Sequence, residues 1–212
     1  MDKVDFRKRL KHLYGPPAEF TLVEVPPMQF VKIDGKGDPN TAPGYAAAIQ
    51  WLFSVSYALK FGSKKEGRDY TVPPPEALWF ADDMSAFTRQ ARDQWRWTQM
   101  IMAPDWIKGA AFAAAVKVAS AKLGRPPASL RLEKYDEGLS VQFLHVGSYA
   151  EEAPRIMQLH EEFLPANGLV ANGMHHEIYL SDPRRVPAGK LKTIVRQPVR
   201  RLAAGRDKKA AR

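Results

Sequence analysis

The segment His175-His176-Glu177-Ile178-Tyr179-Leu180-Ser181-Asp182-Pro183 decides how the rest of the chain is interpreted. Apolar and polar residues alternate over its first six positions and an Asp-Pro pair follows, which predicts a β-strand that ends at this pair. Successive side chains of a strand point to opposite faces of the sheet. The even-numbered residues are therefore expected to pack on a core. The odd-numbered residues His175, Glu177 and Tyr179 share the other face, which borders water or lines a pocket.

Length and composition are those of a globular protein, with 212 residues of which 45% are hydrophobic. No apolar run approaches the roughly 18 residues that a membrane span needs, and the first residues lack the apolar segment of a signal peptide. The chain has no cysteine, which excludes disulfides, a thiolate nucleophile and a cysteine-based zinc site. We therefore expect a cytoplasmic protein without a cofactor, either a monomer or a homodimer.

The net charge of +9 is concentrated at the C-terminal end. Residues 200–212 hold six basic residues and one acidic residue, so they contribute +5 and the preceding residues only +4. Such a run predicts a solvated, disordered tail, and an electrostatic contact with nucleic acid or a membrane is the alternative. Since zinc-finger spacing and a platform of basic and aromatic residues are missing, nucleic acid is not expected as a partner beyond this tail.

The same order of elements occurs twice along the chain. A strand, a helix and two strands are predicted near residues 29–35, 43–61, 77–80 and 95–102, and again near 139–147, 153–164, 175–180 and 191–195. This tandem predicts an α+β fold with one antiparallel sheet and helices on one side, so that the uncovered side would hold the site. The predicted parts are an N-terminal arm (1–19), a domain (20–199) with pseudo-repeats 20–106 and 130–199 joined by a helix at 107–124, and the tail (200–212).

Six stretches between about Phe20 and Val199 have a distinctive order. They are Pro75-Glu76-Ala77-Leu78-Trp79-Phe80, Trp95-Arg96-Trp97-Thr98, Glu137-Gly138, Gln142-Phe143-Leu144-His145-Val146-Gly147-Ser148-Tyr149, the opening segment extended to Arg185, and Leu191-Lys192-Thr193-Ile194-Val195-Arg196-Gln197-Pro198-Val199. In this order they resemble the GyrI-like small-molecule-binding family. The sequence departs from the family pattern at Ala77 and Phe80, where Gly and Trp are favoured.

The resemblance implies a duplicated strand-helix-strand-strand module, the SHS2 type, with a central ligand cleft between the halves. The family includes drug-sensing domains of bacterial transcription regulators, a gyrase-inhibiting protein, and free-standing members that hydrolyse DNA-alkylating cyclopropane natural products. The sequence carries no recognisable DNA-binding domain, so we expect a free-standing member.

Glu177 is the first candidate catalytic residue, because the cleft glutamate of the family maps onto it. Burial among aromatic rings is expected to raise the pKa of this carboxyl, which suits a general base that acts on water. From the residues alone, an exposed strand carboxylate paired with an arginine is an equal alternative. Glu76 is the comparable residue of the first half. Pseudo-symmetry predicts that it faces Glu177, and the alternative is a solvated residue at the start of a strand.

Aromatic residues are the candidate ligand contacts. Flat rings stack on aromatic ligands and attract cations, although aromatic residues at alternate strand positions are also typical of a core. The resemblance favours a ligand wall, with tyrosines that donate to a ligand carbonyl or to water. The predicted ligand contacts are Trp79, Phe80, Trp95, Trp97, His175 and Tyr179, and Tyr149 completes the candidate catalytic set with Glu177 and Glu76.

No metal site is predicted from the histidines. His175 and His176 are adjacent on a strand and point to opposite faces, so they cannot easily bind one ion. A hydrogen-bonded structural role is expected for His176 and a role in the cleft for His175. A nucleophile elbow with the pattern Gly-x-Ser-x-Gly is also absent from the sequence, which argues against the common serine hydrolase chemistry.

Three functions are consistent with these features. The first is binding of bulky, planar apolar or cationic small molecules, with hydrolysis of reactive cyclopropane-type compounds by water that Glu177 and Glu76 position. The second is a binding module that sequesters or senses drugs without catalysis. The third is an interaction with a DNA-associated target, for which the basic tail is the support.

Overall fold

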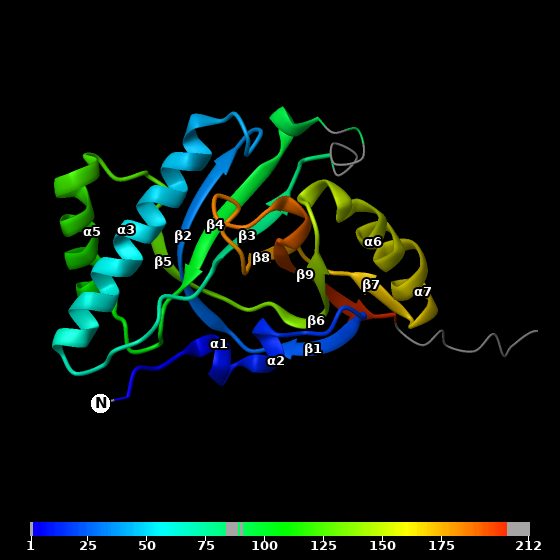
Figure 1. Ribbon diagram of the computed structural model, residues 1–212, viewed down its shortest axis with the longest axis horizontal. Helices are drawn as coiled ribbons and strands as arrows, with labels where there is room; N and C mark the ends of the chain where they lie inside the picture. Colours follow the sequence, from blue (N-terminus) through cyan, green and yellow to red (C-terminus); the bar gives the residue numbers. More distant parts are fainter. Residues whose placement is uncertain (1, 84–88, 90, 203–212) are drawn as a thin grey trace, which may run out of the picture.

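The computed structural model describes residues 2–83, 89 and 91–202, and its core is one antiparallel sheet (Figure 1). Eight strands follow the order β1-β6-β9-β8-β3-β4-β2-β5, and β7 pairs with the end of β9. The strands are β1 (Thr21–Val25), β2 (Met28–Lys36), β3 (Pro75–Phe80), β4 (Arg96–Met102), β5 (Arg131–Tyr135), β6 (Gly138–Val146), β7 (Leu169–Ala171), β8 (His175–Tyr179) and β9 (Lys192–Arg201).

The order of the strands has a pseudo-twofold symmetry. Reading inward from one edge gives β1, β6, β9 and β8, and reading inward from the other gives their counterparts β5, β2, β4 and β3. The two halves meet at the β3–β8 pair in the middle of the sheet. Each half also lends its first strand to the other, since β1 pairs with β6 and β5 pairs with β2. The predicted tandem is confirmed, and the exchanged strands join it into one sheet.

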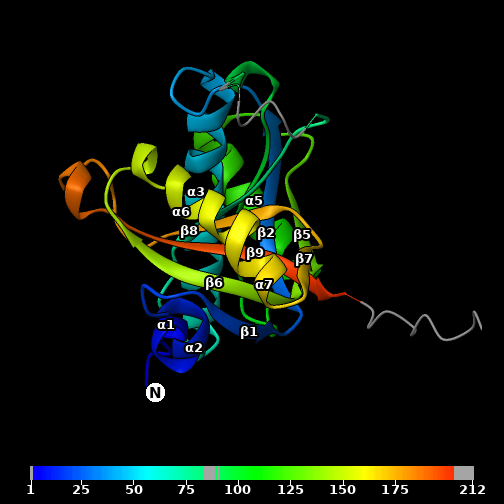
Figure 2. The same cartoon turned by 90° about the vertical axis from the view of Figure 1, so that its right-hand side faces the viewer.

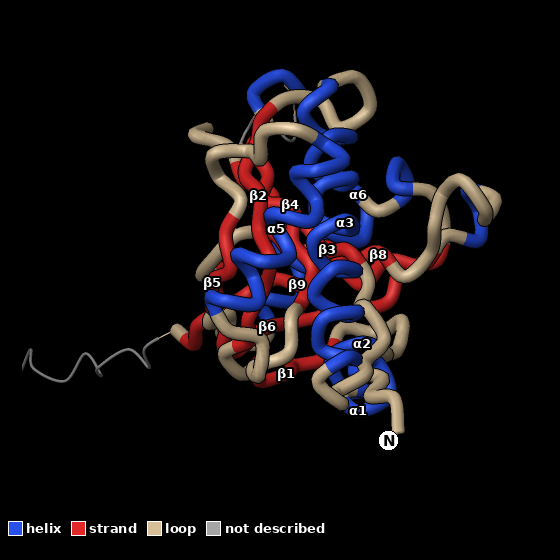
Figure 3. The backbone as a smooth tube through the Cα atoms, turned by 90° about the vertical axis from the view of Figure 1, so that its left-hand side faces the viewer, coloured by secondary structure: helices blue, strands red, loops and turns tan. Residues whose placement is uncertain are grey.

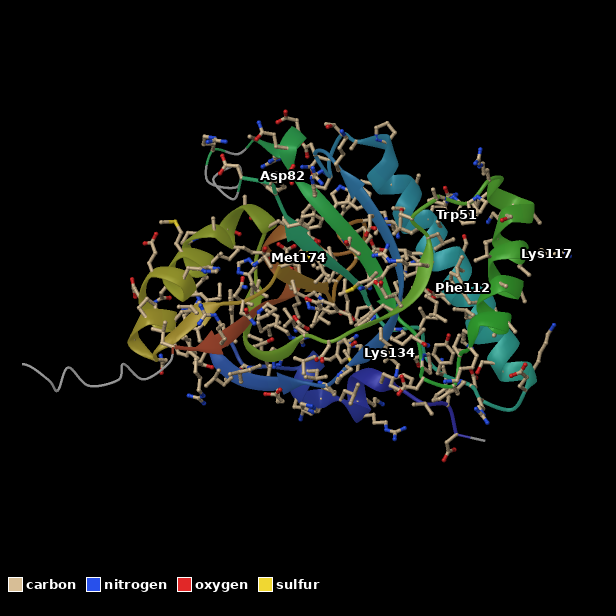
Figure 4. All side chains as sticks on the ribbon, turned by 180° about the vertical axis from the view of Figure 1, so that it is seen from behind. Trp51, Asp82, Phe112, Lys117, Lys134 and Met174 are labelled. Carbon is tan, nitrogen blue, oxygen red and sulfur yellow. The ribbon has the colours of Figure 1, made fainter. Side chains whose placement is uncertain are left out.

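The longer helices lie on one face of the sheet, as predicted. α3 (Pro43–Lys65) packs over the first half, and α5 (Gly109–Leu123), which joins the two halves, lies beside it (Figure 3). Trp51 of α3 and Phe112 of α5 belong to the core between these helices and the sheet, whereas Lys117 points to solvent (Figure 4). α6 (Ala153–Gln158), a π-helical turn (Leu159–Phe163) and α7 (Leu164–Ala166) cover the second half (Figure 2).

The opposite face of the sheet is covered by the N-terminal segment. The short helices α1 (Phe6–Arg9) and α2 (Lys11–Tyr14) follow an Asp5 side chain that accepts hydrogen bonds from two backbone amides of α1. Phe6, Leu13 and Tyr14 are buried in one core with strand residues such as Ile178. The prediction of an uncovered side is therefore wrong, because apolar residues of this charged segment fold back onto the sheet.

The ends of two elements differ from the sequence-based expectation. α3 continues beyond residue 61, where the predicted helix ended, and reaches Lys65. β9 extends to Arg201, so the first two residues of the predicted tail are strand residues that pair with β7. The remainder of the predicted tail, from residue 203, lies outside the described residues. No helix in the described part of the chain has the length and apolar character needed to cross a membrane.

Candidate functional site

The middle of the sheet, where the two halves meet, carries the predicted site. On β8 the side chain of Glu177 and those of its odd-numbered neighbours are partly exposed, whereas His176 and Ile178 are buried. The register places Ala77 of β3 beside Glu177. Ala77 belongs to the same core as Leu52 of α3. The Glu177 face is therefore the face that bears the long helices.

Both oxygens of the Glu177 carboxylate have a hydrogen-bonding neighbour. The Tyr179 hydroxyl donates to Oε2 over 2.7 Å, and Nε2 of His175 lies 3.3 Å from Oε1. Trp79 Nε1 in turn donates to the Tyr179 hydroxyl over 3.1 Å. These contacts fix the carboxylate in place and leave 15% of the Glu177 side chain exposed. Within the described residues, Glu177 has no arginine partner, so that alternative is not realised.

Glu177 is the ionised carboxyl of the site. Burial raises its pKa, but hydrogen bonds from His175, Tyr179 and Trp79 favour the charged form, and its pKa lies below the usual value. The predicted rise is therefore wrong, because donors on β8 and β3 outweigh the cost of burial. Tyr179 keeps its proton, since burial and the Glu177 charge raise the pKa of this phenol well above its usual value.

Six aromatic side chains on this face are linked by ring contacts and by the hydrogen bond between Trp79 and Tyr179, and are called here the aromatic cluster: Tyr45, Trp79, Trp95, Trp97, Tyr149 and Tyr179. Tyr45 of α3 stacks on Trp79 with ring centroids 6.1 Å apart, and its ring meets Trp97 edge-on at 5.1 Å. Trp95 meets Trp79 edge-on at 5.8 Å. On the other side of Glu177, Tyr149 meets Tyr179 edge-on at 5.8 Å. Rings from both halves therefore gather around one carboxylate in geometries that aromatic pairs prefer.

The rings of the cluster differ in depth. Trp97 is 1% exposed and lies over Gly35 of β2, where an added Cβ atom would be 2.1 Å from the ring. Only glycine leaves room for the indole at this position. Tyr149, which precedes α6, is 42% exposed and is the outermost ring of the cluster. The cluster thus has a fixed inner wall and an exposed outer ring.

Several buried polar atoms on this face have no hydrogen-bond partner among the described residues. Gln99 is fully buried, yet neither its Oε1 nor its Nε2 has a partner. It lies opposite Ala77, one strand beyond Glu177. Glu152 Oε1 and Trp97 Nε1 also lack partners. Buried polar groups are normally hydrogen-bonded in folded proteins. The Tyr45 hydroxyl is the neighbour of Gln99 and the Thr193 hydroxyl is the neighbour of Glu152, and the remaining donor and acceptor positions of these side chains suit a polar ligand or water.

Glu76 does not face Glu177. It pairs with Ile178 in the β3–β8 register and points to the opposite face, where it is fully buried. The Tyr14 hydroxyl donates to its Oε1 over 2.9 Å, and Nε2 of His176 lies 2.9 Å from its Oε2. The prediction that the two glutamates face each other is therefore wrong, because the strand begins within the run of three prolines and the sequence did not fix its register.

The register of the strands also decides on which face of the sheet the other predicted residues lie. Phe80 shares the face of Glu76 by strand alternation, so the structure does not bring it to the aromatic cluster. The structure does bring together Glu177, Trp79, Trp95, Trp97, Tyr149, His175 and Tyr179. Sequence reasoning missed three residues on this face, namely Tyr45, Gln99 and Glu152. Tyr45 reaches this face through its ring contacts with Trp79 and Trp97, and burial together with the charge of Glu177 raises the pKa of its hydroxyl to about 12.

Glu76 belongs to a buried charge cluster beneath the N-terminal helices, formed by Glu76, Glu137, His176 and Arg196. Arg196 is fully buried and donates to Glu137 Oε2 over 3.1 Å, to Gln142 Oε1 over 3.0 Å and to the Leu13 carbonyl over 2.8 Å. Two carboxylates face two cations, so the cluster is neutral overall. It ties the N-terminal segment to β8 and β9, directly behind the Glu177 site.

His176 is the second cation of this cluster. Nδ1 lies 2.8 Å from Glu137 Oε1 and Nε2 lies 2.9 Å from Glu76 Oε2. A carboxylate oxygen only accepts, so both ring nitrogens carry protons and the ring is an imidazolium. Burial lowers the pKa of His176, but Glu137 and Glu76 outweigh this effect and raise the pKa to about 9. The structural role predicted for His176 agrees with these contacts.

The charge of His176 makes stability depend on pH. A raised pKa stabilises the fold fully below the unfolded value of about 6.5, and the effect is lost as the pH rises through about 9. The free energy of unfolding should therefore fall by roughly 3 kcal/mol across this window. Urea unfolding at several pH values measures how the free energy of unfolding changes with pH. We expect this dependence to flatten in His176→Gln and to persist in His12→Gln, which alters an exposed histidine. Equal slopes in the two variants would contradict this origin.

Two surface hollows among the described residues lie elsewhere. One of about 420 Å³ runs along α6 beside Arg155 and Glu161, and one of about 300 Å³ lies beside Asp69 and Trp106. Neither is lined by Glu177 or by the aromatic cluster. The described residues also include no group of three or more His, Asp or Glu arranged to hold a metal ion. The Glu177 site is narrow, with 15% of the Glu177 side chain exposed, and the candidate chemistry there is that of its side chains.

Comparisons with known proteins agree with this fold. The family described as GyrI-like small molecule binding domain matches residues 18–200. The chain belongs to this family. A crystal structure of an uncharacterized conserved protein from Listeria innocua is 35% identical, covers 93% of this chain and 100% of its own, and has a TM-score of 0.86. The resemblance stated from the sequence is therefore confirmed.

Two further structures are similar to this chain. A hydrolase encoded by lin2189 from Listeria innocua is 34% identical, covers 94% of this chain and 100% of its own, and has a TM-score of 0.84. The C-terminal domain of EcmrR is 11% identical, covers 87% of this chain and 98% of its own, and has a TM-score of 0.57. At that identity the likeness shows the fold alone. No curated protein matches the sequence.

Proposed function

We propose that this protein binds bulky, planar aromatic compounds, cationic or polarised, at the Glu177 site, and that it adds water to bound compounds that carry a strained cyclopropane ring. The observation that supports binding is an ionised carboxylate among aromatic rings from both halves of the chain. Attraction between charges is stronger in such a desolvated site than in water, and each well-placed ring adds about 0.5–2 kcal/mol of attraction for a cation.

The way into the site runs past its outermost ring. Only 15% of the Glu177 side chain is exposed, so a bulky ligand has to displace side chains around it, of which Tyr149 is the most exposed at 42%. The incoming ring then replaces contacts between protein rings by contacts with the ligand. Buried polar atoms such as those of Gln99 become partners for its polar groups.

Hydrolysis is the more specific part of the proposal. It is supported by the ionised Glu177, which can accept a proton from water, and by the 34% identity to a structure described as a hydrolase. Glu177 removes a proton from a bound water, and the hydroxyl oxygen attacks a carbon of the strained ring. The broken C–C bond leaves its electron pair on the conjugated ligand, whose carbonyl oxygen takes up the charge. General base catalysis of this kind contributes about 10²–10⁴-fold.

Fluorescence titration with two ligands of one shape tests the binding proposal. 10-Methylacridinium is a planar cation, and acridine is its neutral counterpart at pH 8. We expect the protein to bind the cation about tenfold more tightly, because the ion pair and cation-π attraction add over 1 kcal/mol. Glu177→Gln should remove the part of this preference that comes from the ion pair and keep the smaller part that comes from the rings, with little change for acridine. Glu24→Gln, which alters an exposed carboxylate on β1, should keep the full preference. Equal affinities for both ligands, or an undiminished preference in Glu177→Gln, would refute the site.

A further inference from the structure

Glu152 is a second carboxyl on the face of Glu177 that the mechanism above does not use. It follows the short turn that carries Tyr149 and precedes α6. Its neighbour Glu151 is exposed and bonds to Ser148, whereas Glu152 is only 3% exposed and its Oε1 has no hydrogen-bond partner among the described residues. A charged side chain that is buried without a partner is costly, so its environment must account for it.

The surroundings of Glu152 place it beside the Glu177 site. Thr193 of β9 is 1% exposed, lies opposite Tyr179 in the β8–β9 register, and its hydroxyl is the hydrogen-bonding neighbour of Glu152. Tyr149, three residues before Glu152, meets the ring of Tyr179 edge-on. The Tyr179 hydroxyl bonds to Glu177, and the charge of Glu177 acts on Glu152, so the two carboxyls border one site.

Two carboxyls in one desolvated site do not both ionise, and the hydrogen bonds decide which one holds the charge. Glu177 receives hydrogen bonds from Tyr179 and His175. Glu152 has no comparable donor, and Thr193 offers only a hydroxyl. The charge therefore belongs on Glu177 and the proton on Glu152.

The titration of Glu152 agrees with this division. Burial and the charge of Glu177 raise the pKa of Glu152 to about 9, with a small opposing effect from Thr193. The other titratable groups nearby include Tyr149, with a pKa raised to about 12 by burial and by the charges of Glu177, Glu152 and Asp182, Tyr179 of β8, and His145 of β6, whose Nε2 contacts the Ser148 carbonyl. Glu152 is thus a neutral carboxylic acid over the range in which Glu177 is a carboxylate.

We propose that Glu152 is the proton donor of the Glu177 site and recognises ligands by their carbonyl oxygen. This rests on the proposed function and supplies its missing step. Water gives one proton to Glu177, its oxygen bonds to the ring carbon, and the ring C–C bond breaks. The electron pair passes through the conjugated system to the carbonyl oxygen, which takes the proton of Glu152. The reaction leaves Glu177 neutral and Glu152 charged, so one proton must pass between them, through solvent or Tyr179, before the next turnover.

The binding part of this proposal needs no turnover to be tested. The probes are 10-methylacridone, which has a carbonyl oxygen, and acridine, which has none. Glu152→Met removes the donor at similar volume, and we expect it to weaken 10-methylacridone binding about tenfold, the value of a buried hydrogen bond, with acridine unchanged. Glu152→Gln keeps an N–H donor and should retain most of the affinity. Above pH 9, where Glu152 loses its proton, the unaltered protein should also lose its preference for 10-methylacridone over acridine. Equal 10-methylacridone affinity in all three proteins would overturn the role of Glu152.

The rate of water addition separates this proposal from the proposed function. With a spirocyclopropane dienone as substrate, both Glu152 variants should be slower by about 10²–10⁴-fold at pH 7, because neither can give up a proton. An undiminished rate in Glu152→Gln would overturn the proton-donor role and leave the hydrolase proposal intact. If the unaltered protein forms no product, the hydrolase proposal fails, and the 10-methylacridone titration alone decides whether Glu152 donates to ligands.

Discussion

Glu177→Gln is expected to slow water addition to a spirocyclopropane dienone by about 10²–10⁴-fold, the range that a general base contributes. The amide has the size of the carboxyl and can still accept a hydrogen bond from Tyr179, but it cannot take a proton from water. Affinity for neutral aromatic compounds should change little, because the aromatic cluster is unaltered. Mass spectrometry of the product, which is heavier by one water, measures the rate.

The control for this experiment is Glu24→Gln, which makes the same change of charge at an exposed position on β1. It should hydrolyse the compound at the rate of the unaltered protein. A product that forms equally fast in Glu177→Gln would remove Glu177 from the mechanism. Binding of the compound without product in any of the proteins would show a module that sequesters such compounds without hydrolysing them.

Arg196→Met is expected to lower the free energy of unfolding by about 3–5 kcal/mol, the typical cost of removing one partner from a buried ion pair. Arg196 is fully buried, and it is the cation that contacts Glu137 Oε2. Without it the cluster carries an excess negative charge, and the carbonyl of Leu13 loses its donor. Urea unfolding at pH 6, where the other members keep their charges, measures the effect.

Two further variants separate charge imbalance from lost packing. Arg184→Met removes an arginine that pairs with Asp182 on the surface, and it should change stability by at most about 0.5 kcal/mol. Arg196→Met combined with Glu137→Gln should be more stable than Arg196→Met alone, because the uncompensated carboxylate is gone. A double variant that is less stable than the single one would show that packing, not charge, sets the cost.

The alternation around Glu177 was enough to predict both the strand and the residues on its two faces. Period-two patterns fix side-chain direction without knowledge of the tertiary structure. The repeated order of elements likewise predicted two similar halves from the sequence alone. The position of Glu76 could not be predicted in this way. One residue of shift in a strand moves every side chain to the other face, and only the pairing of Glu76 with Ile178 shows which register β3 adopts.

The residues that were missed have ordinary local contexts. Tyr45 occupies an apolar position of α3, where a core role and a site role look alike. Glu151 and Glu152 are adjacent acids at a helix start, and nothing in their sequence indicates that one is exposed and the other buried. Likewise the N-terminal segment is rich in charge, yet its few apolar residues cover a face of the sheet. Such features depend on contacts between distant parts of the chain.

The pairing of Ala77 with Glu177 gives the duplicated chain a freedom that two identical subunits would lack. β3 and β8 begin at Pro75 and His175, so Ala77 and Glu177 hold equivalent third positions and lie side by side on the pseudo-twofold axis. In a dimer of identical halves, a glutamate at this position would meet its own copy across the axis, and two like charges there repel. Joining the halves in one chain allows one copy to become alanine. A single carboxylate then has a distinct partner on each side, and a ligand can bind in only one of the two orientations that the symmetry would otherwise make equal.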